Sequence, residues 1–128
     1  AEAGKTDDLT LLDVIDAQHI AEALSRRHAN EDMYTAIGPV LVAVNPYTAL
    51  SKMGKSIVSD DVAWHYFLEP NRLTLAPHVF KVAADAYSDM VTHQEAQCIL
   101  VTGESGAGKT ETAKHVMGFV SAVGGSGE

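Results

Sequence analysis

The chain has little of what several common classes of protein require. Cys98 is its one cysteine, so no disulfide can form within the chain. No apolar run approaches the roughly 18 residues of a membrane-spanning helix, so we expect no membrane span. Nine basic and 17 acidic side chains give a net charge of −8. Because nucleic-acid binding requires a basic patch, we expect no nucleic acid among the partners.

Potential metal and acid–base sites are also scarce. The six histidines lack the i, i+4 spacing or the cysteine partners of metal sites, which predicts surface or helix-end positions for His19, His28, His65, His78, His93 and His115. Adjacent carboxylates point in different directions in a helix or strand, so they are interpreted as solvated: Asp7–Asp8, Glu31–Asp32 and Asp60–Asp61. Cys98 lies in an apolar run, which indicates a buried thiol in a reducing compartment.

The first half of the chain predicts a helix followed by a hairpin. A composition of 46% hydrophobic and 20% charged residues is typical of a globular protein. Asp16 is a suitable N-cap for a helix that continues to about His28. The strands Met33–Ile37 and Val40–Val44 follow, and Gly38-Pro39 between them favours a type II′ turn. The second strand is apolar throughout, which predicts that both its faces are covered.

The second half predicts three helices. Residues 51–56 resemble a loop, after which Asp60 or Asp61 can cap a short helix containing Trp64. Pro77 suits the first position of the next helix. The apolar stripe of that helix is Val79, Val82, Ala83, Ala86, Tyr87 and Met90. The last helix is predicted over Glu111–Val123, and its apolar face is Ala113, Val116, Met117 and Val120.

A phosphate-binding pattern precedes the last helix. Gly103-Glu104-Ser105-Gly106-Ala107-Gly108-Lys109-Thr110 fits G-x-x-x-x-G-K-[ST], with a predicted strand, Cys98–Thr102, before it and a helix after it. The glycines let backbone N–H groups converge on an anion at the start of a helix. Lys109 can reach the β- and γ-phosphates, and the Thr110 hydroxyl can bind Mg²⁺. Glu104 would repel a phosphate, so we expect only its backbone to contribute.

A second candidate segment follows the apolar strand of the hairpin. Asn45, Pro46 and Tyr47 lie where a strand ends, which is where α/β proteins place ligand crevices. The same residues also suit a simple turn that ends the strand. Both interpretations remain open from the residues alone.

The sequences of four segments, taken in order along the chain, resemble those of the myosin motor ATPases. Residues 100–114 are similar to that family's loop, GESGAGKT followed by E and T, and three further segments match in order: Asp7–Leu12, Met33–Tyr47 and Ala76–Met90. The resemblance implies an α/β fragment of a P-loop NTPase (myosin/kinesin-like) motor domain, with an incomplete mixed sheet flanked by helices. It implies that residues 1–128 are the N-terminal part of that domain and end after the helix of the phosphate loop.

The same resemblance implies a nucleotide, a metal and partners. ATP with Mg²⁺ would be held by Gly103–Thr110 and Glu111, and Asn45–Tyr47 would approach the adenine. The family usually continues with a proline and a tyrosine after this point, where this chain has residues 51–57. A flexible loop grips a base poorly, so we expect weak discrimination among ATP, GTP and CTP. The implied location is the cytoplasm, in a myosin complex of the cytoskeleton.

The sequence lacks the parts that complete such an ATPase. The family's two switch segments, of the N-x-x-S-S-R and D-I-x-G-F-E type, do not occur here. The resemblance implies that the actin filament is bound through regions outside this chain, and that the remainder of the motor domain is a partner. We therefore expect the isolated residues to be inactive. A non-catalytic interaction module and another P-loop nucleotide enzyme remain the alternatives.

Overall fold

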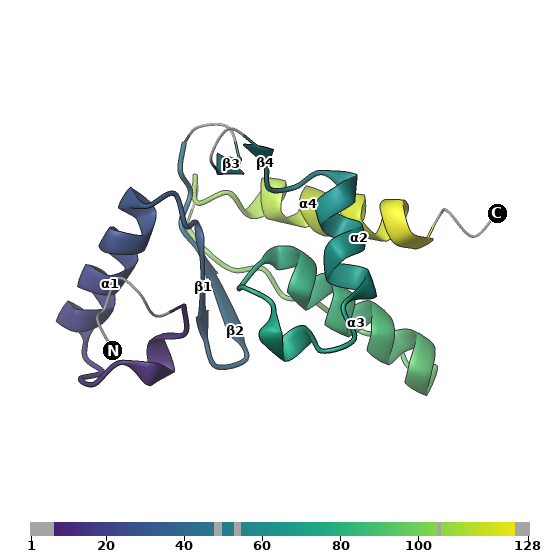
Figure 1. Cartoon of the computed structure of the whole chain (residues 1–128), viewed down its shortest axis with the longest axis horizontal. Coiled ribbons are helices and arrows are strands. Elements are labelled where there is room, and N and C mark those ends of the chain that lie inside the picture. The colour runs from purple at the N-terminus through teal and green to yellow at the C-terminus, as the bar shows by residue number, and fades with distance from the viewer. Residues whose placement is uncertain (1–6, 48–49, 53–54, 105, 125–128) are drawn as a thin grey trace. The chain divides into compact units, whose positions relative to one another are not determined.

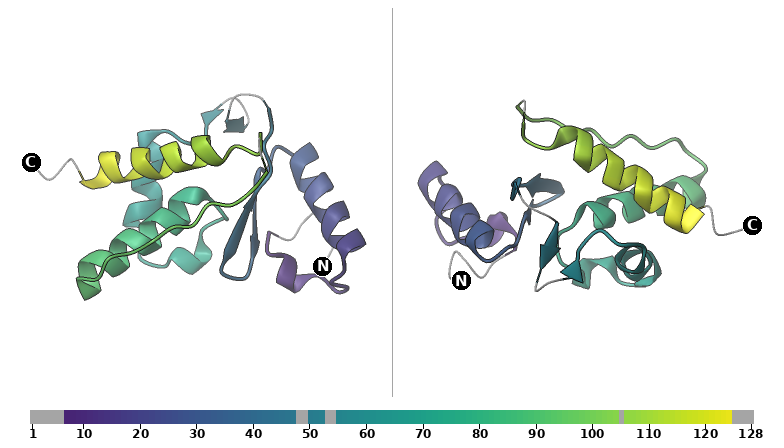
Figure 2. Two further views of the ribbon diagram at one scale, coloured as in Figure 1. Left: turned by 180° about the vertical axis from the view of Figure 1, so that it is seen from behind. Right: turned by 90° about the horizontal axis from the view of Figure 1, so that it is seen from above.

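The computed structural model describes residues 7–47, 50–52, 55–104 and 106–124 (Figure 1, Figure 2). The chain divides into two compact units: Ala1–Ser56 with Ala76–His78, and Ile57–Leu75 with Val79–Glu128. The main elements are α1 (Ala17–Ala29), β1 (Tyr34–Ile37), β2 (Val40–Ala43), β3 (Ser51–Lys52), β4 (Lys55–Ser56), α2 (Asp60–Leu68), α3 (Val79–His93) and α4 (Lys109–Gly124). Short 3₁₀ helices lie at Leu9–Leu11 and Arg72–Thr74.

Helix α1 of the first unit begins where the sequence predicts. Asp16 is its N-cap, and the Asp16 carboxylate accepts a hydrogen bond from the backbone N–H of His19 at 2.8 Å. This bond satisfies one of the donors that the first helical turn leaves unpaired. The small apolar core beneath the helix consists of Leu9, Leu12 and Ala23, with Ile20, Leu24 and Ile37 packed against it. The predicted cap is confirmed.

A buried arginine joins α1 to the first strand. Arg27 donates from Nε to Thr35 Oγ1 at 2.8 Å and from Nη2 to the Tyr34 carbonyl at 2.9 Å. Hydrogen bonds from a charged donor are stronger than neutral ones, so these two bonds hold the helix firmly against β1.

Strands β1 and β2 form the antiparallel hairpin that the sequence predicts. Ile37 pairs with Val40, and Gly38 between them has a φ of 58°. A positive φ at the first central residue is what a type II′ turn needs. The expectation that residues 40–44 are covered on both faces is wrong, because Val40 is exposed and the rest of β2 is half-buried. A sheet of two strands leaves its outer surface uncovered.

The described residues contain two antiparallel hairpins in place of the expected mixed sheet. Strands β3 and β4 pair with each other in a region expected to be a loop, and β1 has one isolated parallel bridge, from Ala36 to Asp8. The predicted strand Cys98–Thr102 has no regular secondary structure, and Cys98 is exposed, so the expectation of a buried thiol is also wrong. A strand needs a hydrogen-bonded neighbour, and none of the described strands pairs with this run.

Aromatic side chains hold the three helices of the second unit together. The Phe67 ring of α2 lies edge-on to Tyr87 of α3 at 5.6 Å and to Phe119 of α4 at 6.3 Å between centroids. Phe80 of α3 approaches Phe119 at 5.5 Å. Phe119 is fully buried and therefore lies at the centre of this unit. None of the helices in the described ranges is long and apolar enough to cross a membrane.

The helix starts of this unit differ slightly from prediction. Ser59 caps α2, with Ser59 Oγ accepting from the Val62 N–H at 3.4 Å, so neither Asp60 nor Asp61 is the cap. Helix α3 begins at Val79, two residues after Pro77. A serine and an aspartate are both good N-caps, and the sequence pattern alone does not choose between neighbours.

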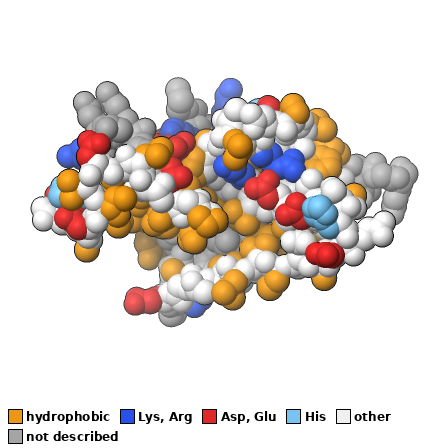
Figure 3. Space-filling view, turned by 90° about the horizontal axis from the view of Figure 1, so that it is seen from below, with side chains coloured by type: hydrophobic (Ala, Val, Ile, Leu, Met, Phe, Trp, Pro, Cys, Tyr) orange, Lys and Arg blue, Asp and Glu red, His pale blue; other side chains and the backbone are white. Residues whose placement is uncertain are grey.

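Helix α4 buries a different face from the predicted one. Its buried residues are Phe119 and Val123, whereas Met117 and Val120 of the predicted face are exposed. Helical periodicity identifies a helix, but α4 is apolar on two sides, and the pattern does not say which side is covered. Figure 3 shows apolar side chains at the surface in the face that it presents, with charged side chains among them.

Candidate phosphate-binding site

The described residues of the phosphate loop, 103–104 and 106–110, include glycines with positive φ values. Gly106 and Gly108 have φ values of 84° and 97°, in a region that side-chain-bearing residues avoid. Helix α4 then begins at Lys109, and its first bond runs from the Thr112 N–H to the Gly108 carbonyl at 2.9 Å. Alternating backbone orientations at a helix start direct N–H groups toward one point, which is the arrangement that binds anions.

Lys109 lies over the start of this loop. Its ammonium donates to the Gly103 carbonyl at 2.5 Å. A Cβ added at Gly103 would lie 3.6 Å from Lys109 Cγ and 3.3 Å from the Ala107 Cβ. A side chain at Gly103 would therefore be crowded by Ala107, whereas its contact with the Lys109 stem would be an ordinary one. The structure brings Gly103, Ala107 and Lys109 together.

The start of α4 combines a cationic side chain with the positive end of a helix dipole. Thr110 and Glu111 occupy the first turn, and both are exposed. Glu111 Oε1 accepts from Lys114 Nζ at 3.3 Å, a pair that lies along the helix surface. Both side chains are mostly exposed, so this pair contributes little to the electrostatics of the loop.

The metal that the resemblance implies has one evident ligand here. The Thr110 hydroxyl is exposed at the second residue of α4, and a hydroxyl oxygen is a suitable Mg²⁺ ligand. The described part of the chain contains no group of three or more His, Cys, Asp or Glu side chains that could hold a metal alone. The Thr110 hydroxyl therefore fits the role of one ligand of such a metal.

The remaining loop residues are placed only in part. Glu104 is exposed, and its carbonyl accepts from the Ala107 N–H at 3.1 Å, so its backbone shapes the loop. Ser105, which the pattern also includes, lies outside the described residues.

The base-side segment, residues Asn45–Tyr47, belongs to the first unit, whereas the phosphate loop belongs to the second. Asn45 Oδ1 accepts from the Tyr47 N–H at 2.8 Å, which makes a tight turn. Tyr47 has a φ of 55° and is 80% exposed. A non-glycine residue in the left-handed region is uncommon, so the turn holds the Tyr47 backbone in a costly conformation.

Two histidines depart from the predicted surface or helix-end positions. His78 is buried, and its ring lies 4.7 Å from that of Tyr34. His115 lies in the middle of α4, and its Nε2 is buried without a hydrogen-bond partner among the described residues. Burial lowers the pKa of His115, while the nearby Glu111 carboxylate acts in the opposite direction. Sequence periodicity gave no signal for either burial, because the positions follow from tertiary packing.

Sequence reasoning also missed an ion pair between Lys52 of β3 and Asp32. Asp32 had been interpreted as solvated because it adjoins Glu31. The two residues are 20 positions apart in the sequence. Only a prediction of the β3–β4 hairpin could have suggested that they lie close together.

Comparisons with known proteins find relatives that match nearly the whole chain. The family model for the myosin head (motor domain) matches residues 6–128. The chain is 44% identical over 123 residues to the myosin IB heavy chain of Dictyostelium discoideum, covering 96% of this chain and 10% of that protein. It is 45% identical over 118 residues to myosin-1 of Coprinopsis cinerea, covering 92% and 9%. It is 45% identical over 121 residues to myosin-1 of Eremothecium gossypii, covering 94% and 9%.

The chain thus spans about a tenth of the length of these curated relatives. The matching region includes the phosphate loop and the hairpin that leads to the base-side segment. A family model that covers nearly every residue is far more specific than the phosphate pattern alone. The chain belongs to the myosin head (motor domain) family.

Proposed function

We propose that this chain is the N-terminal, nucleotide-binding part of an actin-based myosin motor. The observation that carries the proposal is the geometry of the phosphate loop: two left-handed glycines, Gly106 and Gly108, lead directly into α4, whose first residue is Lys109. Membership of the myosin head family favours a motor over an unrelated phosphate-loop enzyme.

The proposed ligand is Mg-ATP. Lys109 and the loop N–H groups bind the phosphate oxygens, and Thr110 supplies one ligand of the metal. Lys109 donates one hydrogen bond to the Gly103 carbonyl in this structure, and an ammonium group has three donors, so Lys109 can keep this bond while it binds a phosphate oxygen. Asn45–Tyr47 form the base side of the nucleotide site.

The motor function requires further segments of the protein. Hydrolysis of the bound ATP, in the complete motor of the cytoskeleton, drives movement along actin. The chain's own residues contribute binding and orientation of the nucleotide. Positioning of the attacking water and contact with actin belong to the remainder of the motor domain.

Lys109→Ala in the complete motor protein tests this proposal. A triphosphate that loses its cationic partner is left with several kcal/mol of uncompensated charge, so we expect Mg-ATP affinity to fall by at least about 100-fold. Lys114→Ala is the matched control, because Lys114 lies on the same helix but pairs with Glu111. Its affinity should stay within about threefold of the unmodified protein. Equal affinities for the Lys109→Ala and Lys114→Ala proteins would refute the proposed site.

A further inference from the structure

A group of large apolar side chains is exposed in the segment that leads into α1. Leu11, Val14 and Ile15 are 64%, 50% and 60% exposed, and they lie close together in the sequence. Leu9 and Leu12 of the same segment are buried in the core of the first unit. The segment therefore presents one set of aliphatic side chains to the core and a second set to solvent. Exposed apolar side chains are ordinary when they are scattered, whereas a group of them with polar residues around it is typical of an interaction surface.

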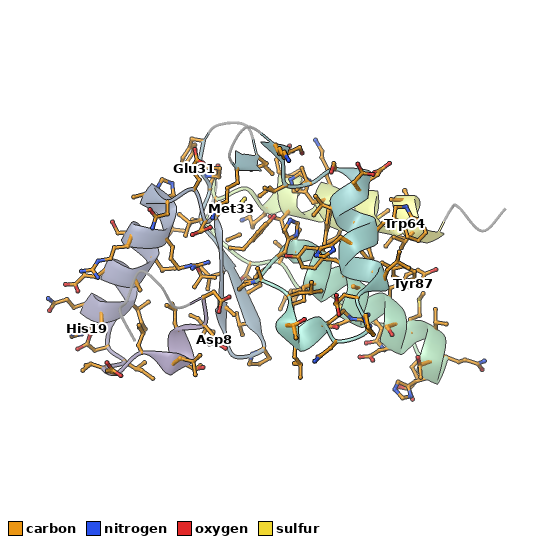
Figure 4. The ribbon with its side chains drawn as sticks, viewed as in Figure 1. Asp8, His19, Glu31, Met33, Trp64 and Tyr87 are labelled. Carbon is orange, nitrogen blue, oxygen red and sulfur yellow. The ribbon has the colours of Figure 1, made fainter. Side chains whose placement is uncertain are left out.

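The tip of the β1–β2 hairpin lies beside this segment. The Gly38 N–H donates to Asp8 Oδ1 at 3.2 Å, and Val40, which follows the turn, is 58% exposed. Figure 4 shows Asp8 beside the hairpin and His19 near the start of α1. In Figure 1 the first 3₁₀ helix and the hairpin tip lie at the same end of the first unit. We call the four exposed side chains at this end the apolar end surface: Leu11, Val14, Ile15 and Val40.

The charged residues around the apolar end surface are mostly acidic. Asp7, Asp13 and Asp16 are exposed. Residues 7–25 contain no lysine or arginine, and residues 34–43 contain no charged side chain. A partner for this surface therefore needs apolar side chains to cover the aliphatic group and cations to pair with the carboxylates. The same carboxylates would repel the anionic surface of a membrane.

The segment that carries three of these apolar side chains is fixed at both ends. Asp8 Oδ1 accepts from the Thr10 N–H at 3.0 Å and from the Thr10 hydroxyl at 2.8 Å, which holds the first turn in place. Before this turn, the Asp7 carbonyl accepts from the Ala36 N–H of β1 at 2.8 Å. After it, Asp16 caps α1. Because its backbone is held before binding, the segment loses little conformational entropy when a partner docks.

A helix suits this surface better than a strand does. A docking strand needs a row of unpaired backbone groups at the edge of a sheet. The apolar end surface instead offers side chains from a 3₁₀ helix, from the residues before α1 and from the hairpin tip, where strand pairing ends. An amphipathic helix places apolar side chains at i, i+3, i+4 and i+7 on one face, and cations can flank that face on both sides.

We propose that the apolar end surface docks a basic amphipathic helix of a partner protein. The apolar face of that helix packs on the four aliphatic side chains. Its lysine or arginine side chains pair with the carboxylates of Asp7, Asp13 and Asp16. The surface uses none of the residues of the phosphate loop or of the base-side segment, so this interaction is an addition to the proposed binding of nucleotide.

A synthetic peptide provides the probe: about 18 leucine and lysine residues, with the leucines on one helical face. Calorimetric titration measures its affinity for the complete motor protein in low salt and in about 0.5 M salt. Ile15→Ser removes an apolar anchor, so we expect it to weaken binding by about tenfold in both salts. Asp13→Lys should weaken binding by about fivefold in low salt and have little effect in high salt, because salt screens exposed charges.

Helix α3 offers a matched control. Val91 is 59% exposed and Asp89 nearby is also exposed, so Val91→Ser and Asp89→Lys make the same changes at another apolar and acidic site. Neither should change the affinity by more than about twofold. A peptide of the same composition with its leucines spread around the helix should bind at least about tenfold more weakly. If the first peptide does not bind the unmodified protein, the inference is overturned. Equal losses of affinity in the Ile15→Ser and Val91→Ser proteins also overturn it.

Discussion

The roles of several single residues in this structure depend on their immediate surroundings. Arg27 would be expected to lie in water, since charged side chains are rarely buried, yet two hydrogen bonds to β1 fix it inside the first unit. Gly103 has a φ of 156°, and a Cβ there would lie only 3.3 Å from the Ala107 Cβ, so both conformation and space favour glycine. In the second unit, His115 has a buried ring nitrogen in the helix that follows the phosphate loop. In each case the contacts of one side chain, or the lack of a side chain, affect how a helix or loop is held.

His115 predicts a pH dependence of stability. Burial lowers the pKa of His115 in the folded state, so the unfolded state binds more protons as the pH falls below about 6.5. The neutral His115 therefore contributes to the free energy of unfolding above that pH. This contribution is lost as the pH falls toward the lowered pKa of His115 in the folded state. We expect the thermal midpoint of the motor protein to drop between pH 7.5 and pH 5.5 by less in His115→Gln. An identical drop in both proteins would show that His115 does not contribute.

At the scale of the element, α4 is an ordinary helix that follows a loop with positive-φ glycines. Gly106 and Gly118 are the same residue type in opposite settings, since Gly106 has a φ of 84° and Gly118 lies within the helix. An added Cβ would meet nothing within 4 Å at either position. The backbone conformation, not the space available, therefore determines whether alanine is tolerated at each position.

Alanine should be favourable at Gly118 and unfavourable at Gly106. Gly118→Ala should raise the free energy of unfolding by about 0.5–1 kcal/mol, because glycine is a poor helix residue. Gly106→Ala should distort the loop and weaken Mg-ATP binding by about tenfold, from a conformational cost of roughly 1–2 kcal/mol. Calorimetric titration and thermal unfolding of both variants provide the comparison. A Gly106→Ala protein that binds Mg-ATP normally would show that the left-handed conformation is not required.

The elements that the sequence predicted correctly are those with local causes. The Asp16 cap, the Gly38 turn and the start of a helix after the phosphate loop all follow from residues within a few positions of one another. The run Cys98–Thr102 failed as a strand because strand formation depends on a partner. The buried face of α4 and the Asp32–Lys52 pair depend on neighbours far along the chain, which periodicity does not identify.

At the scale of the whole molecule, we propose that the chain binds Mg-ATP, and we do not expect it to hydrolyse ATP by itself. Its sequence contains neither of the family's switch segments, to which the resemblance assigns the positioning of the attacking water. We predict that the isolated 128 residues hydrolyse ATP no faster than the same chain with Lys109→Ala. A phosphate-release assay on the two preparations measures this. Turnover that depends on Lys109 would identify an autonomous enzyme.

The central claim is that residues 103–110 hold the phosphates of Mg-ATP. The most direct measurement is an experimental structure of the complete motor protein with Mg²⁺ and a non-hydrolysable ATP analogue. We expect Lys109 Nζ to lie within hydrogen-bonding distance of a phosphate oxygen, and Thr110 Oγ1 to be a ligand of the metal. A bound nucleotide whose phosphates contact neither Lys109 nor the loop N–H groups would contradict it.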